Sequence, residues 1–118
     1  MPTIRLSQIA HARSGDKGNH ANIGVIAYTA AGYDYLHRVL TTERVAEHFA
    51  GWEPTQVKRY ELPRIFALNF VLYDVLAGGA SQSLRIDTQG KLLGTAIADL
   101  MLPEPDDLPA MLRSNAAG

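Results

Sequence analysis

The 118-residue sequence predicts an α+β protein, a two-layer α/β sandwich of about four strands with helices on one face of the sheet. Two observations lead to this class. Segments with the alternation typical of strands are interspersed with segments whose apolar residues recur at helical spacing. Hydrophobic residues make up 47% of the chain, which is enough for one core. We therefore expect a single domain over residues 1–103, followed by a polar tail containing Pro and Asp over residues 104–118.

The first half of the chain predicts two strands and then helix. Thr3–Ala10 alternates as a strand, and Asn22–Thr29 is a run of Ile, Val and Tyr typical of a more buried strand. In Tyr33–Phe49 apolar residues share a helical face, so this segment is interpreted as one broken helix or two short helices. Thr42 is the expected N-cap of the second part, and Gly51 its expected end.

The middle of the chain predicts a strand, a helix and a short strand. Thr55–Leu62 alternates as the third strand. Ile65–Leu76 has apolar residues at helical spacing, and Gly78-Gly79 follows as a helix end. Ser83–Asp87 is the fourth predicted strand. A crossover from the second strand to the third would be right-handed if the two are parallel neighbours.

The C-terminal part predicts helix and a short docked segment. Leu92–Leu100 has helical spacing, and the alternative is a hairpin that turns at Gln89-Gly90. In the tail, Leu108, Met111 and Leu112 can form a short helix docked on the domain, beyond which the last residues should fray.

The composition excludes several classes of function. The chain has no cysteine, which excludes disulfides, thiolate catalysis and Cys-based zinc or iron–sulfur sites. Its histidines lack metal-binding spacing, so no metal site is expected. A net charge of -1 lacks the basic excess of a nucleic-acid binder. Neither a signal peptide nor a span long enough for a bilayer is found, so we expect a cytoplasmic protein without nucleic-acid or membrane partners.

Residues suited to chemistry concentrate in Ala12–Gly24, between the first two predicted strands. This segment is longer than a hairpin turn requires. Its glycines allow several backbone N–H groups to point at one spot, while a serine, an arginine and a lysine add donors and positive charge. A phosphate or carboxylate is the occupant that this chemistry favours. The residues of this predicted anion-binding loop are Arg13, Ser14, Gly15, Asp16, Lys17 and Gly18.

The same segment also has a structural interpretation. Asp16, Asn19 and Asn22 can cap turns of their own backbone, because short polar side chains bond to nearby main-chain groups. Asp16 is in addition the candidate general acid or base, because a positioned carboxyl group can transfer a proton.

Three residues are predicted to support the loop: Asn22, Arg59 and Asn69. Arg59 and Glu61 share a face of the third strand, where they can pair with each other, reach the loop or simply be exposed. Asn69 lies inside the predicted apolar helix. A buried amide there needs a partner, which is either a structural hydrogen bond or a ligand.

Several motifs resemble the small domain of the acyclic terpene utilisation family. The first is Ala12–Gly24, and the others follow in the same order: Arg59-Tyr60-Glu61-Leu62-Pro63, Ala67-Leu68-Asn69-Phe70, Gly78-Gly79, and Asp87 with Gly90-Lys91. The resemblance extends roughly from Ile4 to Leu102. It implies a ferredoxin-like fold and a link to the catabolism of terpenoid or branched acids as CoA thioesters, but it implies no particular reaction.

Two hypotheses of different class follow. In the first, the chain is a component or subunit of an enzyme of acyl-CoA or carboxylate catabolism, with an anion-binding loop at residues 13–22, no cofactor, and a CoA thioester as substrate. In the second, it is a non-catalytic assembly or ligand-sensing module that docks on a larger partner. In both we expect a homo-oligomer, a dimer or higher, because so short a chain leaves a strand edge or apolar face to cover. The large domain of the same family is the candidate partner in trans.

Overall fold

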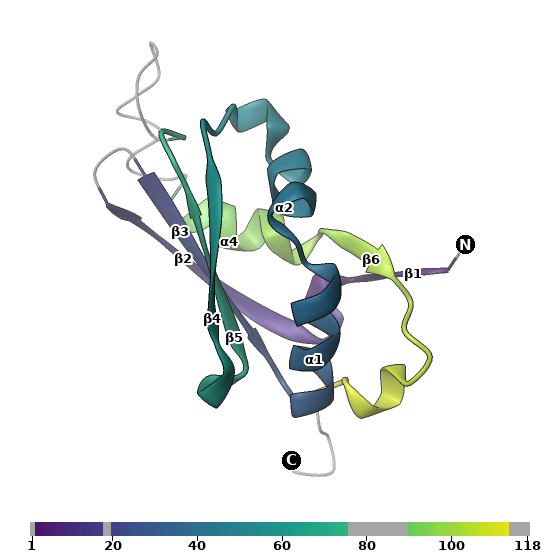
Figure 1. The fold of residues 1–118 in the computed structure, drawn as a ribbon. Helices are drawn as coiled ribbons and strands as arrows, with labels where there is room; N and C mark the ends of the chain where they lie inside the picture. The colour runs from purple at the N-terminus through teal and green to yellow at the C-terminus, as the bar shows by residue number, and fades with distance from the viewer. Residues whose placement is uncertain (1, 18–19, 76–89, 114–118) are drawn as a thin grey trace.

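The computed structural model describes residues 2–17, 20–75 and 90–113, without the side chains of residues 16, 17 and 90–92. These residues form a four-stranded sheet, a separate two-stranded sheet and three α-helices (Figure 1). Both sheets are antiparallel. The predicted α+β class is therefore confirmed.

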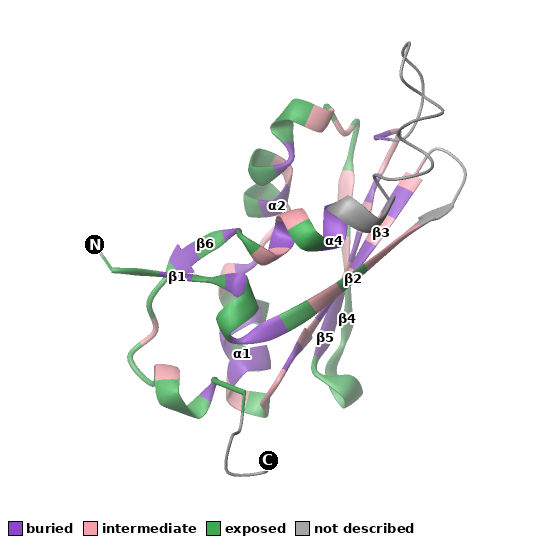
Figure 2. Cartoon of the chain, turned by 180° about the vertical axis from the view of Figure 1, so that it is seen from behind, coloured by how far each residue is buried: buried purple, intermediate pink, exposed green. Residues whose placement is uncertain are grey.

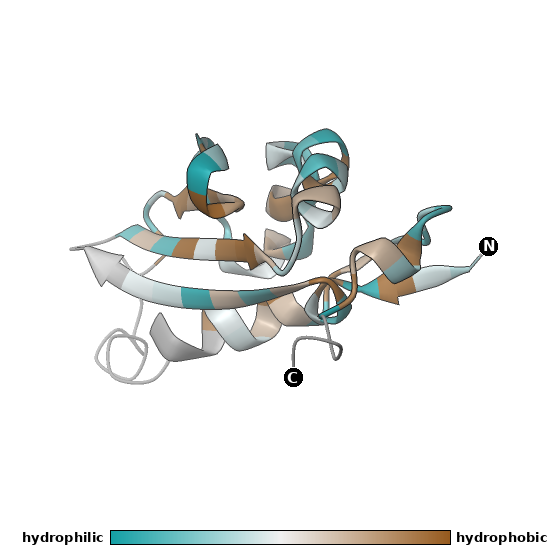
Figure 3. Ribbon diagram, turned by 90° about the horizontal axis from the view of Figure 1, so that it is seen from below, coloured by the Kyte–Doolittle hydropathy of each residue, from teal (hydrophilic) through white to brown (hydrophobic). Residues whose placement is uncertain are grey.

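The four-stranded sheet has the order β2-β3-β5-β4. Its strands are β2 (Ala10–Lys17), β3 (His20–Ala27), β4 (Val57–Leu62) and β5 (Ala67–Leu72). Along β3 every second residue is buried, which appears in Figure 2 as alternating purple and pink. In Figure 3, hydrophobic (brown) and hydrophilic (teal or white) residues follow one another along the strands. One face of the sheet is therefore apolar and covered, and the other is more polar.

Helices α1 (Ala30–Val39) and α2 (Thr42–His48) follow β3. The hydroxyls of Thr29 and Thr41 each accept a hydrogen bond from a backbone N–H in the first turn of α1 and α2 respectively, so each helix has its own N-cap. The sequence left open one broken helix or two short helices for Tyr33–Phe49, and the structure shows two short helices. The cap of α2 precedes the predicted Thr42 by one residue.

All three α-helices lie on the same face of the sheet, here called the helix face. Ser14, Ile23, Phe70 and Arg59 stand opposite one another across the four strands, so their side chains share this face. The N–H of Gly94 in α4 (Gly90–Ala98) donates to the Ser14 hydroxyl at 2.9 Å. At the other edge, the Arg59 guanidinium reaches the carbonyl end of α1.

The core fills the space between the helix face and the helices. Its largest fully buried side chains include Leu36, Phe49, Leu68, Phe70, Leu72, Leu93 and Ile97. The two-stranded sheet extends this core, because β1 (Thr3–Arg5) pairs with β6 (Met101–Pro103) and buries Ile4 opposite Leu102. The Tyr35 hydroxyl of α1 donates to the Pro103 carbonyl and ties β6 to the helices.

The topology contains a split βαβ unit. β3 and β4 run parallel, joined through α1 and α2, with β5 inserted between them. This is the central arrangement of a ferredoxin-like fold. The edge beside β3, which the last strand of such a fold takes, is here occupied by β2 from earlier in the chain. The second and third predicted strands are thus parallel but are not neighbours.

Two predictions for the N-terminal part are wrong. The expected loop Ala12–Gly24 is largely strand, because β2 extends to Lys17 and β3 begins at His20. Its polar residues are compatible with strands because none of the described α-helices covers the open side of the sheet. The predicted strand Thr3–Ala10 is interrupted, because a 3-10 turn at Leu6–Gln8 separates β1 from β2.

The predicted helix Ile65–Leu76 is also wrong, because this segment contains β5 after a 3-10 turn at Pro63–Ile65. Leu68 and Leu72 fit both a helical spacing and an alternating one, and in the structure they are buried on the helix face. The predictions at Gly78-Gly79 and Ser83–Asp87 lie outside the described residues.

The predictions for the third strand and the last helix are confirmed. β4 lies within Thr55–Leu62, and α4 replaces the alternative hairpin at Gln89-Gly90. In the tail, a 3-10 turn spans Leu108–Ala110 and Met111 is buried, whereas Leu112 is exposed rather than docked.

Candidate functional site

The sheet face opposite the helices carries many of the residues that the sequence singled out. It is here called the open face, because the three described α-helices all lie on the other side of the sheet. Two neighbouring rows of residues cross its centre. They are Arg13–Gly24–Asn69–Tyr60 and Gly15–Asn22–Val71–Lys58. Each row takes one residue from every strand, so residues distant in the sequence meet across the sheet.

In these two rows each asparagine stands opposite a glycine. A Cβ atom at Gly15 would lie 3.1 Å from the Oδ1 of Asn22, and one at Gly24 would lie 3.9 Å from the Oδ1 of Asn69. Both amide groups therefore extend over bare backbone. Because glycine has no side chain, each row is bare on the glycine side of its asparagine.

A cavity of about 170 Å³ opens between β3 and β5 at this place. Its lining residues are His20, Ala21, Asn22, Asn69, Val71 and Tyr73. Both amides are half-buried, and within the described residues neither makes a side-chain hydrogen bond. Half-buried polar groups without a protein partner are satisfied by water or by a ligand. The cavity therefore offers donors and acceptors that the fold itself does not use.

His20 stands at one end of the cavity and is held in place by its neighbours. The backbone N–H of Asp74 donates to its Nδ1 at 3.0 Å, and the edge of the imidazole contacts the Tyr73 ring at 4.7 Å between centroids. Because Nδ1 accepts this bond, the proton of a neutral His20 is on Nε2. Asp74 is fixed in turn by the Thr55 hydroxyl, which donates to its Oδ2 at 2.6 Å.

Of the predicted site residues, Arg13, Gly15, Asn22 and Asn69 come together on the open face. Arg13 is exposed at its margin. Asn69 lies in a central strand rather than in a helix, which places it beside the N-terminal segment.

Other predicted site residues do not join this group. Ser14 lies on the helix face, where it accepts the bond from α4. Asp16 and Lys17 belong to β2 opposite Ala21 and His20, and their side chains are outside the described part. Gly18 is outside it as well.

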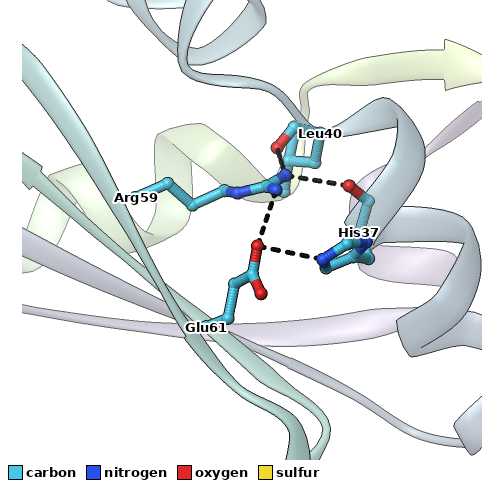
Figure 4. A network of polar contacts seen from close by, with 4 residues as sticks. All are labelled: His37, Leu40, Arg59 and Glu61. Atoms are coloured by element: carbon cyan, nitrogen blue, oxygen red, sulfur yellow. Dashed lines mark hydrogen bonds and ion pairs between the residues drawn. The ribbon is translucent and has the colours of Figure 1, made fainter.

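Arg59 also lies on the helix face, where it closes the end of α1 (Figure 4). Its Nη1 donates to the carbonyl oxygens of His37 and Leu40, both at 3.0 Å, and its Nη2 donates to the Glu61 Oε2 at 3.1 Å. The His37 Nε2 lies 2.9 Å from the same oxygen. Of the alternatives for Arg59, the structure therefore shows the ion pair with Glu61. This arginine satisfies the last carbonyls of a helix, where a cation also complements the dipole.

Sequence reasoning missed His20, Tyr73, Lys58 and Tyr60 on or beside the open face. The signal that could have found the last two is the alternation of β4, which sets Lys58 and Tyr60 apart from Arg59 and Glu61. His20 and Tyr73 come from two strand ends whose pairing is not visible in local sequence.

The described residues contain no group of three His, Cys, Asp or Glu side chains arranged to hold a metal ion. None of the described helices is long and apolar enough to cross a membrane. The family described as the AtuA ferredoxin-like domain matches residues 4–103. The chain belongs to this family. The comparisons with curated proteins and with solved structures gave no match.

Membership of the AtuA ferredoxin-like domain family agrees with the resemblance found in the sequence. The matched residues include both strands of the first hairpin, Asn69 and α4, so the open face lies wholly within the family domain. Because the chain has no cysteine, "ferredoxin-like" here describes the fold and not a Cys-ligated iron–sulfur cluster.

Proposed function

We propose that this chain is the ligand-binding component of an enzyme of acyl-CoA or carboxylate catabolism, and that the ligand's carboxylate or thioester carbonyl group binds on the open face. The observation that carries this proposal is the pair of half-buried amides, Asn22 and Asn69, which have no side-chain hydrogen bond within the described residues. This site replaces the predicted loop, while keeping the chemistry that the loop was expected to provide.

The groups around the cavity suit a polar head on an apolar body. Each asparagine offers two N–H donors and one acceptor, so the pair can hold both oxygens of a carboxylate or the oxygen of a thioester. Val71 and Tyr73 line the cavity beside them and provide apolar contact for the adjoining carbons. Arg13, exposed in the neighbouring row, can bind a phosphate or second carboxylate through its guanidinium.

The size of the cavity restricts what it can take. Pockets that enclose a whole drug-sized ligand are about 300–1,000 Å³. The cavity here measures about 170 Å³, which fits one functional group and a few carbons of a larger molecule. The remainder of an acyl-CoA would then lie across β3 toward Arg13 on β2. We assign binding and orientation to this face and no proton transfer, so Asp16 remains only a sequence-based candidate.

The test measures binding of a branched-chain acyl-CoA and of its free acid by calorimetry, using the wild type and single variants. Asn22→Ala and Asn69→Ala should each weaken binding about tenfold, the equivalent of one hydrogen bond. Gln56→Ala is the matched control, because Gln56 is an exposed amide just before β4 and should leave affinity unchanged. Each variant is first shown to be folded by a thermal melt.

Two results would contradict the proposal. The first is an affinity for acyl-CoA or acid that the asparagine variants share with the wild type. The second is the absence of binding to either compound together with tight binding to the large domain of the family, which would favour the docking module instead.

A further inference from the structure

The two edges of the four-stranded sheet are not equally accessible. At β2, the Gly94 N–H of α4 bonds to the Ser14 hydroxyl, and a Cβ at Gly94 would lie only 3.3 Å from the Ser14 backbone nitrogen. The backbone of α4 therefore lies against that strand. β4, by contrast, has no strand beyond it among the described residues, and α1 contacts it from the helix face. β4 is the edge more open to another strand.

Exposed apolar side chains gather at this same edge. The described residues have six exposed large hydrophobic side chains, and four of them lie in β4 and the turn after it. These four, with their exposed fractions, are Tyr60 (47%), Leu62 (45%), Ile65 (59%) and Phe66 (37%). Single exposed apolar residues are ordinary, but a cluster of this kind marks a surface that another molecule covers.

We propose that β4 pairs antiparallel with β4 of a second copy of this chain, about a two-fold axis at Tyr60. The two sheets would then form one continuous eight-stranded sheet. Such an axis stands perpendicular to the sheet and maps each face onto itself. Residues that pair across it must therefore come from the same face, so their numbers are both even or both odd. A symmetric antiparallel pair is therefore centred on one residue, which faces the same residue of the partner, and cannot be centred between two residues.

The charges of β4 favour the register centred on Tyr60 over those centred on its neighbours. With the axis at Tyr60, Arg59 faces the partner's Glu61, and the reciprocal pair forms on the other side. An axis at Arg59 or at Glu61 would instead place two like charges directly opposite each other, which is destabilising in a sheet. Glu61 is 47% exposed even though it already contacts Arg59 and His37, so a second guanidinium can approach it.

The chosen register also pairs the open-face residues. Tyr60 faces the partner's Tyr60, a cross-strand aromatic pair, and Leu62 faces the partner's Lys58. The helices of both copies stay on the same side. The two open faces therefore adjoin, which keeps both cavities accessible in the dimer.

A cysteine scan tests the axis directly, because the natural chain contains no cysteine. Directly opposite residues of antiparallel strands have Cα atoms about 4.5–5.5 Å apart, within the range that a disulfide spans. Tyr60→Cys should therefore give a covalent dimer on mild oxidation. Lys58→Cys is the matched control and should not, because Lys58 faces the partner's Leu62. Equal cross-linking of the two variants, or of neither, would overturn the proposal.

Two variants of Leu62 with opposite charges test the register and leave the contacts of Arg59 unchanged. Leu62→Glu places a carboxylate opposite the partner's Lys58, whereas Leu62→Lys places a second ammonium there. Both remove the same exposed side chain, so their folding should be similar, and melts of both check this. By sedimentation, Leu62→Lys should have a dimer dissociation constant about tenfold higher than Leu62→Glu, since each dimer contains the contact twice. Equal constants for the two variants would refute the register, and a wild type that stays monomeric at every concentration would refute the dimer.

Discussion

Removing the Arg59 guanidinium should destabilise the protein because this group joins β4 to the end of α1 (Figure 4). Its side chain is only 18% exposed. In Arg59→Ala the carbonyls of His37 and Leu40 lose their donor, and a helix end packed on the sheet is left without its cation. Two charge-assisted bonds to carbonyls, partly compensated by water, correspond to about 2–3 kcal/mol of unfolding free energy.

The ion pair between Arg59 and Glu61 should contribute far less to the free energy of unfolding. Glu61 is 47% exposed, and pairs at exposed sites are worth about 0–1 kcal/mol. Glu61→Ala should therefore lower the free energy of unfolding by less than about 1 kcal/mol. Arg59→Lys keeps the charge but loses the planar guanidinium with its several N–H donors, so its loss of stability should lie between those of the two alanine variants. Urea unfolding followed by circular dichroism measures all three. Arg64 is the matched control, because this exposed arginine of the turn after β4 should tolerate alanine within about 0.5 kcal/mol. A loss for Arg59→Ala no greater than that for Glu61→Ala would refute the view that helix capping, rather than the ion pair, is the main contribution.

Three further predictions concern two glycines and a tyrosine. Gly94→Ala should destabilise by about 1–3 kcal/mol in urea unfolding despite its better helix propensity, because the new Cβ would lie 3.1 Å from the Ser14 Oγ. Gly24→Ala should instead stabilise by about 0.5–1 kcal/mol in the same assay, because its Cβ would have no neighbour closer than 3.9 Å. Burial raises the pKa of Tyr35, so its contribution to stability is complete below about pH 10 and is lost as the pH rises further. Melts from pH 8 to 11 should therefore show a smaller alkaline loss in Tyr35→Phe than in the wild type.

Local pattern predicted most of the elements, and it failed where two patterns coincide. β3 was recognised because a run of Ile, Val and Tyr is typical of a buried strand. β5 was not, because Leu68 and Leu72 suit a helix as well as a strand whose inner face is buried. The polar segment before β3 was taken for a loop because sequence alone does not reveal that all the described α-helices lie on one side of the sheet.

The composition of the site was more predictable than its geometry. Arg13, Asn22 and Asn69 were selected for their chemistry, without knowledge of where they lie. That Asn69 faces Gly24 depends on the register between β3 and β5, which the chain sets only when distant segments pair. Arg59 was wrongly grouped with the site for the same reason. Local sequence does not show which face of β4 the helices cover, and Arg59 lies on the covered face.

The pairing of β1 with β6 has a consequence for the order of folding. It brings together residues from nearly opposite ends of the chain, such as Ile4 and Leu102, whereas β2–β3 and β4–β5 are local hairpins. Contacts that close a long loop form late, because their entropic cost must be met before they contribute. We therefore expect the hairpins and α1 to assemble first and the small sheet to join last. Substitutions in β1 or β6 should then accelerate unfolding more than they slow folding.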